Sequence, residues 1–240
     1  MTEFDWREFE AVLFDLDGVV TPTAEIHEHA WGELFAGFDY TEADYLRYID
    51  GKPRYDGVRS FLASRDIQLA DGDPSDPPGV DTVCALGNRK NELFNTILAR
   101  DGIEPYPGSA ATLDLLADNG IAAAIVSSSK NARTVLNAAG LGARFEVVVD
   151  GTVAAEHHIA GKPAPDMFTY AAEQLHVARD RTVVVEDAVS GVAAGAAGGF
   201  AVVIGVDRGA GAPALLNHGA TFVVADLAEI LPADTPGASA

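Results

Sequence analysis

The chain has 240 residues, of which 48% are hydrophobic and 22% are charged, so it can build a sizeable core and is not a disordered protein. Its formal net charge of −20 would repel nucleic acids and anionic membranes, which bind proteins through Lys and Arg. It carries a single cysteine, no apolar stretch of the roughly 20 residues that a membrane helix needs, and an acidic beginning without a signal core. We therefore expect a cytoplasmic protein with no nucleic-acid or membrane partner, a monomer or alternatively a dimer.

Short apolar runs rich in Val and Ile recur along the chain and have the length of strands. They lie at 11–14, 121–126, 145–149, 182–185, 201–206 and 221–225. Their apolar character is continuous rather than alternating, which indicates strands covered on both faces, as in a parallel sheet. Helical patterns separate them at 109–119, 131–139, 164–175 and 188–197. The alternation predicts a Rossmann-like, doubly wound α/β sheet.

One connection is too long for this pattern. More than 80 residues separate the first predicted strand from the helix near Ser109, whereas such loops usually have about 2–6 residues. Apolar residues in this stretch follow helical spacing, for example Ile26, Ala30 and Leu34, and residues 71–79 (DGDPSDPPG) form a loop. We expect an α/β core at 1–22 and 101–240 and a small helical cap at 23–100.

Two carboxylates end the first predicted strand. Asp15 and Asp17 are two positions apart and can point the same way, at the strand end where ligands bind in open α/β sheets. A carboxylate can attack phosphorus and form an aspartyl phosphate, and a protonated neighbour can donate to the leaving oxygen. A solvated strand end or a helix cap would explain the same pair without any chemistry.

Polar residues end two further strands or precede a helix. Ser127 follows the run at 121–126, and hydroxyls at a helix start can bind an anion or simply cap the helix. Lys162 stands between Gly161 and Pro163, which restrict its backbone. Glu186 and Asp187 follow the run at 182–185, and with Asp15 and Asp17 they form an all-oxygen set that suits Mg²⁺.

These segments, in this order, resemble the four motifs of the haloacid dehalogenase superfamily. The matching stretches are DLDGV at 15–19, the serines at 127–129, GKPAPD at 161–166 and VVVEDAVSG at 183–191. The resemblance covers nearly the whole chain. It implies that Asp15 is the nucleophile and a Mg²⁺ ligand, and that Asp17 is the general acid/base and gives its backbone carbonyl to the metal. It also implies phosphoryl binding by Ser127 and Lys162, Mg²⁺ ligation by Asp187, and a direct or supporting contribution from Glu186.

A narrower resemblance is to the β-phosphoglucomutase family. It extends from Asp15 to Trp31, and it matches Gly51-Lys52-Pro53-Arg54 and Asn88-Arg89-Lys90-Asn91 to two cap motifs. It implies that substrate contacts come from Thr23, His27, Arg54, Lys90, Ser129, Lys130, Asn131 and Lys162. Two departures are Pro22, where an aspartate is common, and a longer insert around 70–80.

The resemblance implies interconversion of β-D-glucose 1-phosphate and glucose 6-phosphate through an aspartyl phosphate and a 1,6-bisphosphate. A first alternative is a Mg²⁺-dependent sugar-phosphate phosphatase, in which water reaches the phosphorylated aspartate before a sugar does. The cap residues Arg54 and Lys90 argue against it, because hydrolysis needs no grip on a distal phosphate. A second alternative, a non-catalytic ligand-binding protein, is disfavoured because both Asp15 and Asp17 are present.

Overall fold

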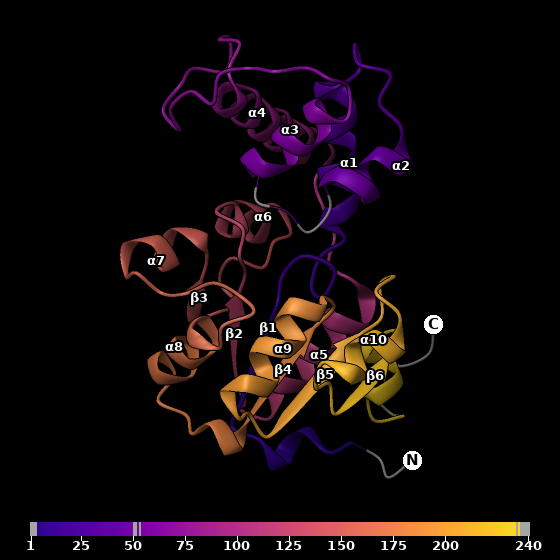
Figure 1. Cartoon of the computed structure of the whole chain (residues 1–240). Coiled ribbons are helices and arrows are strands. Elements are labelled where there is room, and N and C mark those ends of the chain that lie inside the picture. The colour runs from indigo at the N-terminus through magenta and orange to yellow at the C-terminus, as the bar shows by residue number, and fades with distance from the viewer. Residues whose placement is uncertain (1–3, 50–51, 53, 234, 236–240) are drawn as a thin grey trace. The chain divides into compact units, whose positions relative to one another are not determined.

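The chain divides into two compact units in the computed structural model, which describes residues 4–49, 52, 54–233 and 235 (Figure 1). The α/β unit comprises Met1–Pro22 and Ile103–Ala240, and the helical unit is the intervening segment Thr23–Gly102. The sequence predicts that the helical segment ends at residue 100, which lies inside the last turn of its final helix. That helix ends at Asp101 and has Gly102 as its C-cap. The division therefore follows the end of that helix.

The α/β unit is built on a six-stranded sheet in the order β3-β2-β1-β4-β5-β6. All of its strand pairs are parallel. The strands are β1 Ala11–Phe14, β2 Ala122–Val126, β3 Val147–Val149, β4 Thr182–Glu186, β5 Val202–Val206 and β6 Phe222–Val224. Each coincides with a predicted apolar run to within two residues. Because β1 lies between β2 and β4, the strand order reverses its direction there, which is where open α/β sheets bind ligands.

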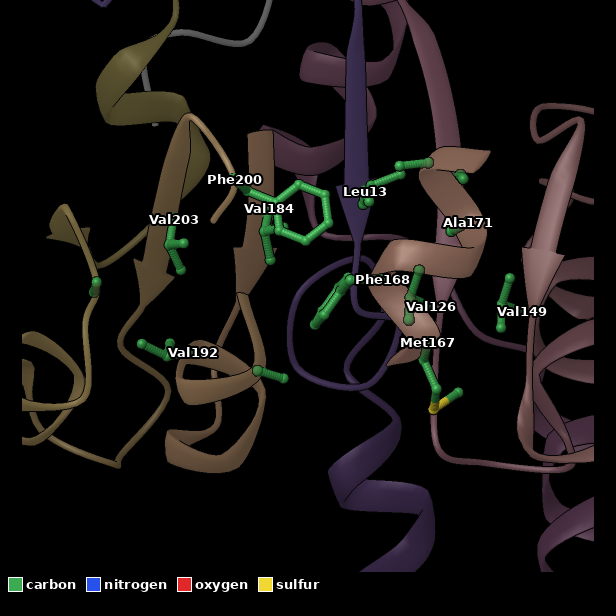
Figure 2. Packing of buried hydrophobic residues seen from close by; sticks show 14 of the residues in the cluster. Leu13, Val126, Val149, Met167, Phe168, Ala171, Val184, Val192, Phe200 and Val203 are labelled. Atoms are coloured by element: carbon green, nitrogen blue, oxygen red, sulfur yellow. The ribbon is translucent and has the colours of Figure 1, made fainter. Parts of the chain in front are cut away.

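Helices follow the strands of this unit. They are α5 Pro107–Asp118, α6 Ala132–Ala138, α7 Gly151–Glu156, α8 Asp166–Gln174, α9 Val189–Gly198 and α10 Ala212–Asn217, with short helices η1 Trp6–Glu8, η3 Arg179–Arg181 and η4 Leu227–Ile230. Met167 and Phe168 of α8 pack with Val192 of α9 against Leu13 and Val184 of the sheet (Figure 2). Because parallel crossovers are right-handed, α5 lies on the opposite face from α8 and α9.

The helical unit consists of α1 Thr23–Leu34, α2 Glu42–Asp44, the π-helix η2 Tyr45–Ile49, α3 Arg54–Ala63 and α4 Val83–Asp101. Its core is aromatic, with Trp31, Phe35 and Phe61 buried together. Gly87 on α4 permits the close approach of α3, because a Cβ there would lie 2.6 Å from the Tyr55 ring. Residues 71–79 form a loop, as predicted. None of the helices in the described part of the chain is both long and apolar enough to span a membrane.

Candidate functional site

The loop after β1 carries the two predicted catalytic carboxylates. Asp15 donates its backbone N–H to the Val185 carbonyl, which extends the β1–β4 pairing by one residue and fixes where the side chain emerges. The Leu16 carbonyl then accepts from the N–H groups of Val20 and Thr21, which folds the loop back on itself. Asp15 is buried, at 7% exposure, and Asp17 is partly exposed.

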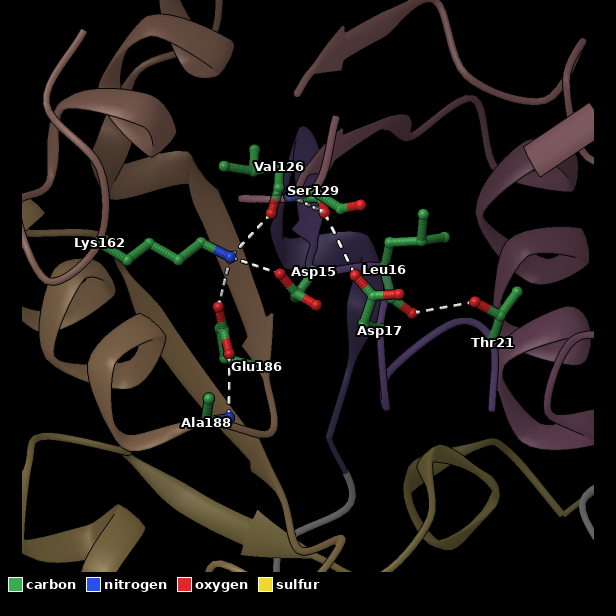
Figure 3. Close-up of polar contacts among 10 residues, drawn as sticks. Asp15, Leu16, Asp17, Thr21, Val126, Ser129, Lys162, Glu186 and Ala188 are labelled. Atoms are coloured by element: carbon green, nitrogen blue, oxygen red, sulfur yellow. Dashed lines mark hydrogen bonds and ion pairs between the residues drawn. The ribbon is translucent and has the colours of Figure 1, made fainter. Parts of the chain in front are cut away.

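Strand register brings three polar strand ends together. Because β2, β1 and β4 are neighbours, Ser127, Asp15 and Glu186 all stand at the carboxyl edge of the sheet. We call Asp15, Asp17, Lys162, Glu186 and Asp187 the carboxylate site (Figure 3 shows all of them except Asp187).

Lys162 is the centre of this site. Its ammonium donates to Asp15 Oδ1 at 2.5 Å, to Glu186 Oε1 at 2.5 Å and to the Val126 carbonyl at 2.8 Å (Figure 3). The other Glu186 oxygen, Oε2, accepts from the Ala188 N–H at 3.0 Å. Glu186 therefore has a partner on each oxygen, and its contacts in this structure favour support of Lys162 over direct metal binding.

The charge balance of the site explains its pKa values. Burial opposes the charge of Lys162, but Asp15 and Glu186 raise its pKa above the ordinary lysine value. Burial raises the pKa of Glu186, and the neighbouring ammonium of Lys162 partly opposes this effect. The resulting pKa of Glu186 is about 7. Burial, followed by repulsion from Asp15 and Glu186, raises the pKa of Asp187 to about 9. One lysine thus leaves the carboxylates with an excess of negative charge.

Asp187 lies against the backbone of the loop after β1 that carries Asp15, Asp17 and Gly18, which we call the catalytic loop after its predicted role. A Cβ at Gly18, whose φ is +84°, would be only 2.0 Å from Asp187 Oδ2. Among the described residues, no three His, Cys, Asp or Glu side chains make a ready-made metal site. A divalent cation bound at this site would meet carboxylate and carbonyl oxygens, and its charge would offset the repulsion from Asp15 and Glu186 that contributes to the raised pKa of Asp187. The donor set is all oxygen and fits Mg²⁺.

The predicted phosphate-binding segment forms a hydrogen-bonded turn. Ser127 Oγ accepts from the Ser129 N–H at 3.0 Å and donates to Asp17 Oδ2 at 3.4 Å, which links it to the carboxylate site. Ser129 Oγ accepts from the Asn131 N–H at 3.1 Å. α6 begins at Ala132, so Asn131 stands at its N-cap, but its side chain makes no capping hydrogen bond. Lys130 is exposed.

The helical unit holds a second group of predicted site residues, which we call the cationic group: His27, Arg54 and Lys90. Lys90 is 4% exposed, and its ammonium donates to His27 Nδ1 at 2.5 Å. It lies 5.0 Å from the Phe94 ring, on which the His27 ring also stacks. Burial, and then the charges of Lys90 and Arg54, lower the pKa of His27 well below the ordinary histidine value, so it is neutral.

Arg54 begins α3 and is fixed by α4, because its Nη2 donates to Asn91 Oδ1 at 2.8 Å. Thr23, the first residue of α1, is fully buried. Gly51 and Pro53, which belong to the predicted motif around Arg54, lie outside the described residues.

Some contacts of the site were not foreseen from the sequence. One is the hydrogen bond from the Lys162 ammonium to the Val126 carbonyl. Another is the close packing of Glu186 against Gly191, where a Cβ would be 1.7 Å from Glu186 Oε1. Arg208, which donates to the Gly18 carbonyl at 3.0 Å, was also missed. Its position just after β5 was the available signal, since polar residues at strand ends are site candidates in such sheets.

The model of the haloacid dehalogenase-like hydrolase family matches residues 9–199 of the chain. The chain belongs to this family. The strand-end acids and Lys162 thus stand in a protein of the haloacid dehalogenase type, which confirms both the predicted α/β fold and the prediction of an enzyme.

Individual members of the haloacid dehalogenase family are similar over most of the chain. A β-phosphoglucomutase of Mycobacterium tuberculosis is 50% identical over 243 residues, covering 94% of this chain and 92% of that protein. A β-phosphoglucomutase of Bacillus subtilis is 31% identical, covering 82% and 83%. The crystal structure of a family hydrolase from Deinococcus radiodurans, with bound phosphate and sodium, has a TM-score of 0.72 at 33% identity, covering 93% and 94%.

Proposed function

We propose that the protein is a β-phosphoglucomutase, which interconverts β-D-glucose 1-phosphate and glucose 6-phosphate through a phosphorylated Asp15 and a 1,6-bisphosphate. The observation that carries the proposal is the presence of two separate charged groups. The carboxylate site suits phosphoryl transfer, and the cationic group suits a second phosphate that does not react. The 50% identity to a protein of this name supports the same reaction.

In the proposed reaction, the sugar hydroxyl at C6 attacks phospho-Asp15. The bond from phosphorus to Asp15 breaks, and Asp17 accepts the hydroxyl proton. The 1,6-bisphosphate then binds in the reverse orientation. Asp15 attacks its other phosphate, Asp17 returns the proton to the leaving oxygen at C1, and glucose 6-phosphate is released. Lys162, whose ammonium donates to Asp15 Oδ1, offsets the negative charge that develops during transfer.

Mg²⁺ would be held by Asp15, Asp187 and the Asp17 carbonyl, and its chemistry is charge neutralisation at the transferring phosphoryl group. Ser127, Ser129, Lys130 and Asn131 are proposed to bind phosphate oxygens. Glu186 is proposed to hold Lys162 in place, consistent with its salt bridge of 2.5 Å.

The cationic group is proposed to bind the sugar and its non-reacting phosphate. Arg54 can offer parallel N–H groups to a phosphate, which makes it the residue for the distal dianion. Lys90 and neutral His27 are proposed to bind sugar hydroxyls, together with Thr23 near the start of α1. Water as acceptor would need none of these contacts, so they favour transfer to a sugar over hydrolysis.

The test is an assay of the products. Protein, Mg²⁺, β-glucose 1-phosphate and a trace of β-glucose 1,6-bisphosphate are incubated, and glucose 6-phosphate is separated from inorganic phosphate. We expect glucose 6-phosphate to exceed released phosphate by a large factor and to require the bisphosphate for rapid onset. Stoichiometric release of phosphate and free glucose would instead assign the chain as a phosphatase.

A further inference from the structure

Arg208 connects the catalytic loop to the segments that follow β5 and β6 through hydrogen bonds. It follows β5 by two residues, and its guanidinium donates to the Gly18 carbonyl, the Ala225 carbonyl and Asp226 Oδ2, each at 3.0 Å. Its Cζ lies 3.8 Å from the centroid of the Tyr106 ring. The guanidinium is thus held by hydrogen bonds in its plane and by an aromatic face against it.

Gly18 lies between the two acids of the site, because it follows Asp17 in the sequence and packs against Asp187. Its φ is +84°, and its N–H donates to the Thr21 carbonyl at 2.9 Å. Asp187 packs where a Cβ would stand. The Gly18 N–H belongs to the peptide group shared with Asp17, and the Gly18 carbonyl belongs to the peptide group shared with Val19. A change in the backbone angles of Gly18 would therefore shift the main chain at Asp17 relative to the carbonyl that Arg208 holds, and it would disturb the packing of Asp187 against Gly18. Arg208 holds the carbonyl end of the Gly18 residue, and Thr21 holds its N–H end.

Arg208 is itself fixed, so it can act as an anchor. Only 23% of its side chain is exposed. Asp207 Oδ1 accepts from the N–H groups of Gly209 and Gly211, which orders the loop that bears Arg208. Asp226 uses its second oxygen, Oδ1, to accept from the Ala228 N–H at the start of η4. The anchor is thus built from the segments after β5 and β6.

We propose that Arg208 is a positioning residue for phosphoryl transfer. By holding the Gly18 carbonyl, it fixes the conformation of the loop that carries Asp17 and against which Asp187 packs. It contacts neither Asp17 nor Asp187 through the hydrogen bonds above, so it acts through the loop. The proposal rests on the functions proposed for Asp17 and Asp187. Partners that orient metal ligands typically contribute 10–100-fold to metal affinity or activity.

The test uses the full-length protein with Mg²⁺ and two readouts. One is the hydrolysis of p-nitrophenyl phosphate, which needs no sugar. The other is the Mg²⁺ concentration that gives half of the maximal stabilisation against urea, which needs no turnover. For Arg208→Ala we expect a kcat lower by about 10–100-fold, a KM within about threefold, and a roughly tenfold higher Mg²⁺ midpoint. Guanidinium at millimolar concentration should restore part of the lost kcat.

Two controls separate positioning from general support of the fold. Arg179→Ala removes a guanidinium that also donates to a glycine carbonyl, that of Gly198, away from the catalytic loop. Asp226→Asn weakens the ion pair but leaves the bond from Arg208 to Gly18. Both should keep kcat within about twofold of the wild type. Arg208→Lys keeps the charge but can make fewer of the bonds, and we expect it to lose at least half of the effect of Arg208→Ala.

A folded Arg208→Ala or Arg208→Lys protein with wild-type kcat and wild-type Mg²⁺ midpoint would overturn the proposal. So would an Arg179→Ala protein as impaired as Arg208→Ala, because the loss would then not be specific to the guanidinium that holds the catalytic loop. A wild type without any phosphoryl transfer would refute the proposed function instead, and the Mg²⁺ midpoints would still decide the case of Arg208.

Discussion

The two charged groups of this protein solve opposite problems. In the α/β unit, the carboxylates of the site outnumber their one lysine, and burial, followed by repulsion from Asp15 and Glu186, raises the pKa of Asp187 to about 9. In the helical unit, Lys90 and Arg54 lie near a histidine, whose pKa is lowered by burial and by those cations. The carboxylate site therefore favours the binding of a cation, and the cationic group favours the binding of an anion. A chain of net charge −20 can therefore handle a doubly phosphorylated sugar by confining positive charge to particular places.

Asp15→Asn gives the largest effect that we expect. Asp15 is proposed to supply the attacking oxygen and a metal ligand, and an amide replaces neither, so isomerisation and aryl-phosphate hydrolysis should both fall by more than about 10⁴-fold. EDTA should stop the wild type likewise, and added Mg²⁺ should restore it. Steady-state rates of the variant, after its sequence and fold are verified, decide the matter, and appreciable turnover would refute the assignment.

Asp17→Asn should fold and lose about 10²–10⁴-fold in kcat, because an amide cannot move the proton to and from the sugar hydroxyl. The loss should depend on the acceptor or leaving group. A substrate with a good leaving group, such as p-nitrophenyl phosphate, should retain faster phosphorylation of Asp15 than β-glucose 1,6-bisphosphate does. Wild-type rates with every substrate would make Asp17 a structural residue of the loop.

Asp187→Asn should stabilise the metal-free protein at alkaline pH. The folded-state pKa of about 9 lies above the ordinary aspartate value, so the folded protein binds the proton more tightly than the unfolded chain. The contribution of this proton to the free energy of unfolding is therefore lost as the pH rises from the ordinary aspartate pKa to the folded-state pKa. At pH 8 without Mg²⁺ we expect the variant to be more stable in urea unfolding by up to about 5 kcal/mol, because each unit of pKa shift corresponds to about 1.4 kcal/mol. It should also lose the Mg²⁺-dependent stabilisation of the wild type.

The control for that measurement is Asp180→Asn, which changes an exposed aspartate of η3 in the same unit. Its carboxylate site is intact, so its stability should depend on Mg²⁺ and pH as the wild type's does, and the difference in stability between this control and the wild type should be constant in the same range. If the stability of Asp187→Asn depends on Mg²⁺ and pH in the same way as that of this control, the carboxylate site does not carry the excess charge described above.

Lys90→Met should produce the smallest effect, an increase in the pKa of His27. The ammonium at 2.5 Å disfavours protonation of the ring, and its removal takes away one of the causes of the lowered pKa. Burial remains, so the pKa should stay below the ordinary histidine value. NMR titration of the ring protons measures the change, with Lys52→Met as a control on an exposed lysine. An unchanged or lower pKa in Lys90→Met would contradict the description of this group as cationic.

The sequence predicted the α/β unit better than the contacts of either charged group. Continuous apolar runs gave the strands within two residues, because a strand buried on both faces leaves little choice of residue type. Asp15, Ser127 and Glu186 were placed together because each ends a strand, and parallel strands end at one edge. The short helices α7 and α10 were not predicted, since six residues carry too little periodicity.

Side-chain contacts between distant segments could not be predicted in the same way. The bonds from Lys162 to the Val126 carbonyl and to Glu186 span 36 and 24 positions, and that from Arg208 to Gly18 spans 190. Such contacts depend on how loops pack, and no local pattern encodes them. The partner of Arg54 on α4, Asn91, follows the same rule, because it depends on the packing of α3 against α4 at Gly87.

The most direct test of the division between the two groups is the ratio of isomerisation to p-nitrophenyl phosphate hydrolysis in Arg54→Ala, relative to the wild type. Arg54 is proposed to bind only the non-reacting phosphate, so its loss should lower kcat/KM for β-glucose 1-phosphate by about 10²-fold and leave aryl-phosphate hydrolysis within about threefold. Arg100→Ala, which removes an exposed arginine paired with Asp101, is the matched control and should leave both activities unchanged. An equal fall of both activities in Arg54→Ala, or no change in either, would contradict the account.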